Sequence, residues 1–133
     1  MKLVSYGGGT GEPSDPYLIH TAEHLNAIGA EPNDWDKHFK LMADIDLSAI
    51  IYSEAVIPNF GGTFDGNKLT ISHLTIEGES GLGLFGRLFG EVKDLGVVDV
   101  NITGSGDHVG GLVGGNRGAA RRVRCPRPGQ TDY

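Results

Sequence analysis

Cysteine, long apolar runs and basic charge are all scarce in this sequence, and each scarcity excludes a class of protein. Cys125 is the single cysteine, so no internal disulfide framework holds the fold. No apolar stretch approaches the roughly 20 residues that a membrane-spanning helix needs, and we therefore expect no membrane span. The opening Met-Lys-Leu-Val is too short to be a signal peptide, so we expect any export signal to lie outside this sequence.

Basic residues are especially few before residue 117. Residues 1–116 carry six Lys and Arg against sixteen Asp and Glu, a net charge of −10. Residues 117–133 carry five Arg against Asp132, a net charge of +4. The acidic main body should repel the nucleic-acid backbone, so we expect no nucleic-acid partner. The tail can attract an anion, although a terminal run of arginines is more often simply solvated.

Glycine, in contrast, is abundant and unevenly spread. The chain has 22 glycines in 133 residues, more than twice the usual share of about 7%. Sixteen of them lie in 61–118, whereas Gly29 stands alone between residues 12 and 60. Each glycine in a helix interior destabilises it by roughly 1 kcal/mol relative to alanine, which excludes a helical bundle. There is no strict three-residue glycine period, which excludes collagen.

The N-terminal part divides into an arm and a short helix. Residues 1–16 contain many helix and strand breakers and predict an irregular arm. Thr21 is a good N-cap and Gly29 stands where a C-terminal cap belongs, so we expect a capping helix over 21–29. Its apolar stripe consists of Ala22, Leu25 and Ile28.

Alternating apolar and polar residues predict a strand over 39–47, with one buried and one polar face. Residues 50–57 are apolar but less regular and predict a second strand that ends at Pro58-Asn59. The residues expected in the core are Leu25, Ile28, Phe39, Leu41, Ile45, Leu47, Phe64, Ile71, Leu74, Ile76, Leu84, Phe85, Val92, Leu95, Val97, Leu112 and Val113.

From residue 61 onward the sequence repeats a short apolar pattern after a glycine-containing element. The pattern occurs at 71–76, again 21 residues later at 92–97, and again 28 residues later at 120–125. A unit of this length cannot bury its apolar face alone and stacks on its neighbours. Glycine at the corners allows close approach of adjacent coils. The repeat therefore predicts an all-β fold, a short parallel β-solenoid.

Several segments resemble bacterial GLUG-repeat surface proteins. They are Tyr-Leu-Ile-His-Thr-Ala-Glu-His-Leu at 17–25, Phe-Lys-Leu-Met-Ala-Asp-Ile-Asp-Leu-Ser at 39–48, Phe-Asp-Gly-Asn at 64–67, Gly-Leu-Phe-Gly at 83–86 and Val-Gly-Gly-Leu-Val-Gly at 109–114. The resemblance covers about residues 10–118. It implies a right-handed parallel β-helix on a secreted or cell-surface bacterial protein, and it implies no catalytic site.

The tail departs from this family pattern. We expect a solenoid domain over 17–116 and a basic, Arg- and Pro-rich tail over 117–133 that is a degenerate last repeat. The last coil then lacks a polar cap, and an uncapped β edge favours pairing with another chain. We therefore expect a homo-oligomer, with the self-association edge at Leu112, Val113 and Val123.

Candidate metal and ligand residues are few. Asp44 and Asp46 share one strand face and are candidates for Ca²⁺, although a solvated strand face is the better interpretation. The sequence has no zinc-binding spacing of His or Cys, and no other cofactor is expected. Trp35, Tyr17 and Tyr52 are the aromatic residues that an exposed sugar-binding face would use.

These features favour a non-catalytic surface or interaction module of adhesin-like type, with a protein or glycan surface ligand. We name no catalytic residue. Two alternatives remain open: a carbohydrate-binding module, and a small carbohydrate-active lyase or hydrolase. In the last case Lys40, Asp44, Asp46 and Asp65 are the side chains that would line a shallow groove.

Overall fold

The fold is all-β with a single helix, as expected from the sequence. The computed structural model describes residues 6–79, 81–104, 113–116 and 119–121, with side chains described only as far as residue 104. Within these residues there are one α-helix, α1 (Ala22–Ala30), and one 3₁₀ turn, η1 (Pro32–Asp34). The strands are β1 (Tyr17–Ile19), β2 (His38–Leu41), β3 (Ile45–Asp46), β4 (Ile51–Tyr52), β5 (Ile57–Phe60), β6 (Thr63–Ser72), β7 (Thr75–Gly78), β8 (Phe85–Leu88), β9 (Glu91–Val98), β10 (Asn101–Gly104), β11 (Val113–Asn116) and β12 (Ala119–Arg121).

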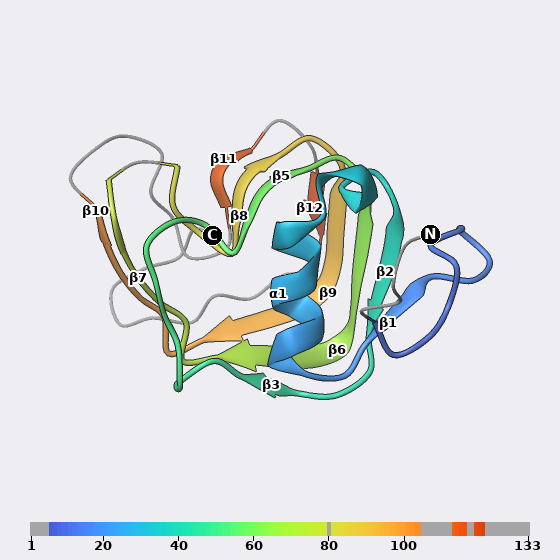
Figure 1. Cartoon of the computed structure of the whole chain (residues 1–133), viewed down its shortest axis with the longest axis horizontal. Helices are drawn as coiled ribbons and strands as arrows, with labels where there is room; N and C mark the ends of the chain where they lie inside the picture. The colour runs from blue at the N-terminus through green and yellow to red at the C-terminus, as the bar shows by residue number, and fades with distance from the viewer. Residues whose placement is uncertain (1–5, 80, 105–112, 117–118, 122–133) are drawn as a thin grey trace.

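The strands form three parallel sheets that the chain visits in a fixed order (Figure 1). The largest sheet has the order β1-β2-β6-β9-β12, with β3 also paired to β6. The other two have the orders β10-β7-β4 and β11-β8-β5. From β4 onward the chain passes through the β4 sheet, then the β5 sheet, then the largest sheet, and it repeats that order twice more.

The spacing between stacked strands is nearly constant. Phe85 lies opposite Ile57 on one side and Val113 on the other, each 28 positions away in the sequence. In the β4 sheet, Thr75 lies opposite Ile51 and Asn101, at 24 and 26 positions. Each layer of the three sheets is therefore one segment of 24 to 28 residues in this part of the chain.

Helix α1 begins at the predicted cap. The Thr21 hydroxyl accepts a hydrogen bond from the His24 amide at 3.1 Å, which satisfies one donor of the first turn. Gly29, however, is not a C-terminal cap, because the helix continues to Ala30. A Cβ at Gly29 would lie 2.0 Å from the Val56 carbonyl oxygen, so glycine is required here for close packing of the helix on the chain before β5.

The predicted strand over 39–47 is divided in two. Phe39, Leu41, Ile45 and Leu47 are buried as the alternation requires, yet the strand pairing stops after Leu41 and resumes at Ile45. Both pieces pair with β6, which runs through ten residues and shifts register between Asp65 and Leu69. The interruption is thus a bend opposite an irregularity in the neighbouring strand.

The prediction of one strand over 50–57 ending at Pro58 was wrong. The segment contains two strands that belong to different sheets, and β5 continues through Pro58 to Phe60. β5 is an edge strand: the Ile57 amide donates to the Leu84 carbonyl on its paired side. Successive amides of a strand point to opposite sides, so the missing amide of Pro58 removes no bond to β8.

The sequence repeat is partly out of register with the structural one. The apolar pattern in the sequence matches residue 92 with residue 71. In the structure, Val92 lies opposite Phe64, and Ile71 lies opposite Val97. The last copy was aligned correctly, because Ala120 lies opposite Val92.

The core runs between the three sheets and under α1. Every predicted core residue whose side chain the structure describes is buried; Leu112 and the side chain of Val113 lie outside that part. Phe39, Phe60, Phe64 and Phe85 form the aromatic centre of the core, with ring centroids 5.1 to 6.5 Å apart. Sequence reasoning missed several buried residues: Tyr6, Ile19, Ala55, Val56, Ile57, Phe60, Leu82, Leu88 and Val100.

The arm is tied to the edge of the largest sheet. Gly7 donates its amide to the Leu18 carbonyl at 2.8 Å, and Leu18 donates back to Gly8 at 2.9 Å. Tyr6 is buried against the rings of Tyr17 and Phe39. Within the described residues, no helix is long and apolar enough to cross a membrane.

Candidate functional site

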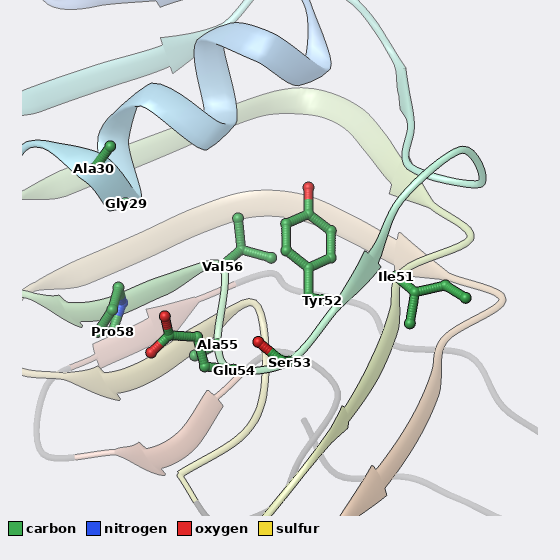
Figure 2. Close-up of a pocket in the computed structure, with 9 residues that line it drawn as sticks. All are labelled: Gly29, Ala30, Ile51, Tyr52, Ser53, Glu54, Ala55, Val56 and Pro58. Atoms are coloured by element: carbon green, nitrogen blue, oxygen red, sulfur yellow. The ribbon is translucent and has the colours of Figure 1, made fainter.

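A shallow groove lies beside β4. It has a volume of about 370 Å³ and is lined by residues 51–56, by Pro58 and by Gly29 and Ala30 at the end of α1. Figure 2 shows the α1 residues on one wall and the β4–β5 connection on the other. We call this cavity the β4 groove. It combines an exposed strand edge with a helix end.

The walls of the β4 groove combine apolar and polar surface. Ile51 is 68% exposed, which is unusual for a large aliphatic side chain next to a sheet. Tyr52 is half-buried, and its ring points toward α1 (Figure 2), where the hydroxyl donates to the side-chain oxygen of Asn26. Burial raises the pKa of the Tyr52 hydroxyl above its ordinary value, so the residue is neutral near neutral pH.

The charge around the β4 groove is acidic. Glu54 is the one charged residue in its lining, and it is exposed. Glu77 and Glu79 flank Gly78, whose Cβ position lies 2.7 Å from the Ser53 carbonyl oxygen, so the end of β7 adjoins the groove. The last turn of α1 carries no basic residue to offset the partial negative charge of its C-terminal carbonyls.

The predicted aromatic candidates are not gathered in one place. Tyr52 lines the β4 groove, whereas Tyr17 packs on Tyr6 with ring centroids 4.6 Å apart. Trp35 packs on the core and donates its indole N–H to the Ile28 carbonyl at 2.7 Å. Trp35 and Tyr17 therefore have structural contacts of their own, and a shared aromatic platform does not form.

Asp44 and Asp46 each connect neighbouring strands. One Asp44 carboxylate oxygen accepts from the amide of Thr70 at 2.8 Å and from its hydroxyl at 3.1 Å. Asp46 accepts from the Ser48 amide at 2.9 Å and contacts His73 Nδ1 at 3.0 Å. The hydrogen bonds from Ser48 hold the pKa of Asp46 below its ordinary value, with a further contribution from His73. Both residues are exposed.

His73 lies between two carboxylates at a corner of the stack. Its Nδ1 contacts Asp46, and its Nε2 lies 3.5 Å from Asp99 Oδ2, one layer further on. His73 and Asp99 both have left-handed backbone conformations, with φ of 60° and 54°. Sequence analysis missed this column, which we call the corner column (Asp46, His73, Asp99), because its members are 26 and 27 positions apart.

His20 and His24 lie next to each other at the N-terminal end of α1, with ring centroids 5.9 Å apart. His24 Nδ1 accepts from the His20 amide at 3.0 Å, so the proton of a neutral His24 ring is on Nε2. That arrangement leaves no lone pair of His24 for a metal ion. Burial, and then the neighbouring His20, lower the pKa of His24. Within the described residues, no group of three or more His, Cys, Asp or Glu is placed to hold a metal ion.

The four residues of the enzyme alternative are spread over two strand segments. Lys40 lies opposite Asp65, on the part of β6 before its register shift. Asp44 contacts Thr70 and Asp46 follows Ile45, both beside the part of β6 after it. The two groups thus lie on opposite sides of the irregularity in β6, and each carboxylate of the second group already accepts hydrogen bonds.

A buried hydrogen bond stabilises the arm. Asp34 is 2% exposed and accepts from the Tyr6 hydroxyl at 2.9 Å. Burial, and then the carboxylate of Asp34, raise the pKa of Tyr6 far above its ordinary value, so Tyr6 remains a hydrogen-bond donor. Asp34 therefore has a structural role in attaching the arm to η1.

Comparison with known proteins finds similarity to much longer chains. The protein is 34% identical over 130 residues to Halomucin from Haloquadratum walsbyi, across 86% of this chain. It is 33% identical over 132 residues to a protein from Evansella cellulosilytica with the provisional name Gly-rich membrane protein, across 89% of this chain. The chain spans 1% of the length of the first relative and 15% of the second. No family model and no solved structure matches it.

Proposed function

We propose that this chain is a non-catalytic structural and interaction module of a longer surface protein, built as a short parallel β-solenoid. The observation that supports this most is the order in which the chain visits its three parallel sheets, three times in succession, with layers of 24 to 28 residues. Modules of this kind stack on their neighbours and present extended outer faces.

The relatives support the surface location. One of them is named Halomucin and the other carries the name of a Gly-rich membrane protein, and both are many times longer than this chain. The resemblance to GLUG-repeat proteins adds a secreted or cell-surface bacterial context and a right-handed coil. We carry both forward as proposals, together with the adhesin-like role.

The test combines a polysaccharide activity screen with glycan and protein binding arrays on the purified chain. The proposal expects no depolymerisation of any polysaccharide, by either lytic or hydrolytic products, together with binding to a protein or glycan surface. Catalytic turnover that is lost on changing Asp44 or Asp65 to Asn would contradict it and favour the small carbohydrate-active enzyme instead.

A carbohydrate-binding module is the second candidate, and the β4 groove is the feature that favours it. A half-buried tyrosine ring beside an exposed carboxylate and serine is a combination that binds sugars. Tyr52→Phe keeps the ring and Tyr52→Ala removes it. Binding of a sugar that stacks on the ring should therefore be lost only in the alanine variant. Trp35 and Tyr17 stay candidates for a second contact.

Self-association at the last coil is part of the proposal. Leu112 and Val123 lie outside the described residues, and for Val113 only the backbone is described. β11 and β12 are the terminal strands of their sheets within the described chain. Sedimentation should show an oligomer that dissociates on placing a charge at Val113. A monomer at high protein concentration would remove this part of the proposal.

Calcium binding at Asp44 and Asp46 has its own test. The two carboxylates are exposed, and one oxygen of each is already hydrogen-bonded. If Ca²⁺ binds there, EDTA should lower the melting temperature, and Asp44→Asn should abolish that effect. An unchanged melting temperature would remove the calcium proposal and leave the two residues as links between strands.

A further inference from the structure

The three sheets differ in what contacts their edge strand at the N-terminal side of the stack. The edge of β1 is bonded to the arm through Gly7, Gly8 and Leu18. The edge strand β5 is contacted by α1. Within the described residues, β4 pairs with β7 alone, and the β4 groove opens beside it. Helix α1 contacts β4 through the Tyr52–Asn26 hydrogen bond, but the backbone edge of β4 has no partner strand within the described residues. An unpaired strand edge next to a hollow with an exposed isoleucine is a place for a further segment of chain.

The chemistry of the β4 groove selects a cationic side chain with an apolar stem. Glu54 supplies a full negative charge, and the C-terminal end of α1 at Gly29 and Ala30 adds a partial one. The ring of Tyr52 and the side chain of Ile51 supply apolar surface. Arginine fits this description best, because its methylenes pack on apolar surface while its guanidinium meets carboxylates and carbonyl oxygens.

The residues around the β4 groove also favour a cationic ligand. The segments 51–58, 75–79 and 101–104, which include all strands of the β4 sheet, contain no Lys or Arg and carry three acidic residues, Glu54, Glu77 and Glu79. Lys40 and Lys93, in contrast, lie on the largest sheet, on either side of Asp65. The β4 sheet with its flanking residues therefore has a net negative charge, whereas on the largest sheet acidic and basic residues offset each other.

One segment of this same chain has the complementary composition. Residues 122–133 contain Arg122, Arg124 and Arg127 against Asp132, with Pro126 and Pro128 between and beside the arginines. Prolines restrict a peptide to fewer conformations, which reduces the entropy lost when it binds. We infer that the β4 groove binds residues 122–133 of a second copy of the chain.

The topology makes this contact head-to-tail. β4 is the first strand of its sheet, whereas β12, which leads into residues 122–133, is the last strand of the largest sheet. The groove and the end of β12, after which the tail begins, therefore lie at opposite ends of the stack. A contact between two different surfaces of this kind propagates from copy to copy. This inference rests on the self-association in the proposed function and assigns it a receptor surface.

The test is the association of the full chain carrying Cys125→Ser, which excludes intermolecular disulfides. Sedimentation velocity should show association that weakens at high salt, because exposed charge pairs are screened. Glu54→Lys should raise the dissociation constant at least about tenfold. Glu12→Lys makes the same charge change at an exposed position on the arm and should leave the constant unchanged.

A charge swap completes the design. Replacing Arg122, Arg124 and Arg127 by Glu should abolish association, and adding Glu54→Lys to that variant should restore it. A fluorescent peptide of residues 122–133, with Cys125→Ser, should bind the variant in which the three tail arginines are replaced by Glu. Glu54→Lys in that variant should abolish peptide binding.

Three results would overturn the inference. The first is a monomer at every concentration, including a monomer in which the tail docks on its own chain. The second is an association constant that Glu54→Lys and Glu12→Lys change equally. The third is association that a charge at Val113 abolishes but that the groove and tail variants leave intact. The last result would still leave the proposed self-association of the final coil standing.

Discussion

The buried interior of the stack and its exposed corner are held together in different ways. Inside, Phe60 and Phe85 are fully buried with ring centroids 5.1 Å apart. At the corner, Asp46, His73 and Asp99 face solvent and are joined by polar contacts of 3.0 and 3.5 Å. Apolar burial is non-directional and supplies most of the stability. Exposed hydrogen bonds and ion pairs add little free energy, but they depend on which residues lie opposite each other.

The largest effect should come from placing a charge in the interior. Ile45 is 3% exposed, and Ile45→Asp buries a carboxylate with no partner in place of an aliphatic side chain. We expect a loss of at least about 4 kcal/mol in the free energy of unfolding, and no soluble folded protein. Soluble yield and circular dichroism measure this. A mutant that folds normally would contradict the assignment of β3 to the interior.

Adding a methyl group between layers should lower the stability nearly as much at one glycine, Gly62, and have little effect at its neighbour, Gly61. A Cβ at Gly62 would lie 1.9 Å from the Lys37 carbonyl oxygen, whereas at Gly61 the nearest atom is 3.9 Å away. Gly62→Ala should destabilise the protein by about 3 kcal/mol, because the backbone must move. Gly61→Ala should change the stability by less than about 1 kcal/mol.

Urea denaturation of the two alanine variants provides the comparison. Equal midpoints would show that the layers at residues 37 and 62 do not approach as closely as the structure has them. A smaller loss in Gly62→Ala than in Gly61→Ala would exclude the contact altogether.

The third effect is intermediate and lies outside the core. Asp44→Ala removes two hydrogen bonds to Thr70, so we expect a loss of about 1 kcal/mol in the free energy of unfolding. Asp36→Ala is a matched control, because Asp36 is also an exposed aspartate and its carboxylate has no hydrogen bond or ion pair among the described residues. Chemical denaturation should separate the two variants, and equal stabilities would remove the role of Asp44 as a link between strands.

The smallest effect concerns the corner column and depends on pH. The pKa of Asp46 is lower in the folded protein than its ordinary value, so its ionised form stabilises the fold. That contribution is present above the ordinary pKa and is lost as the pH falls through the lowered one. Asp46→Asn should therefore lower the melting temperature slightly at neutral pH and not in strong acid. A difference that is constant with pH would contradict the ionic contribution.

The local features of the fold were predictable, because they depend on neighbours in the sequence. Thr21 and the apolar stripe determine where α1 begins and which face it buries. The alternation over 39–47 predicted which side chains are buried, although not the bend between Leu41 and Ile45. The core was predictable only in part: every predicted core residue with a described side chain is buried, but residues in consecutive buried runs, such as Val56 and Ile57, were missed because they do not follow a period of two.

The register was not predictable from the pattern alone. Between Asp65 and Leu69, β6 contains three residues, whereas β9 has only Asp94 between the opposite positions, Lys93 and Leu95. Two of the three, Asn67 and Lys68, have left-handed backbone conformations, as does Asp94. This irregularity shifts the apolar positions of β6 relative to those of β9. The apolar pattern in the sequence therefore matched Ile71 with Val92, whereas Ile71 lies opposite Val97.

The candidate site depends on contacts between distant parts of the chain. Tyr52 was chosen from the sequence as an aromatic residue, but its hydrogen bond to Asn26 and its place beside Glu54 and Ala30 follow from how α1 packs. Similarly, Asp46 was chosen as a metal ligand, and only the stacking of layers brings it to His73. Sequence reasoning found individual residues and missed the groups they form.

The most direct test of the central claim is a nuclear Overhauser spectrum of the isotopically labelled chain. Stacked parallel layers in the observed register predict contacts between backbone protons of Phe64 and Val92, and of Ile71 and Val97. Contacts that link Ile71 to Val92 instead, or antiparallel pairing of β6 with β9, would contradict the arrangement of the sheets on which the proposed function depends.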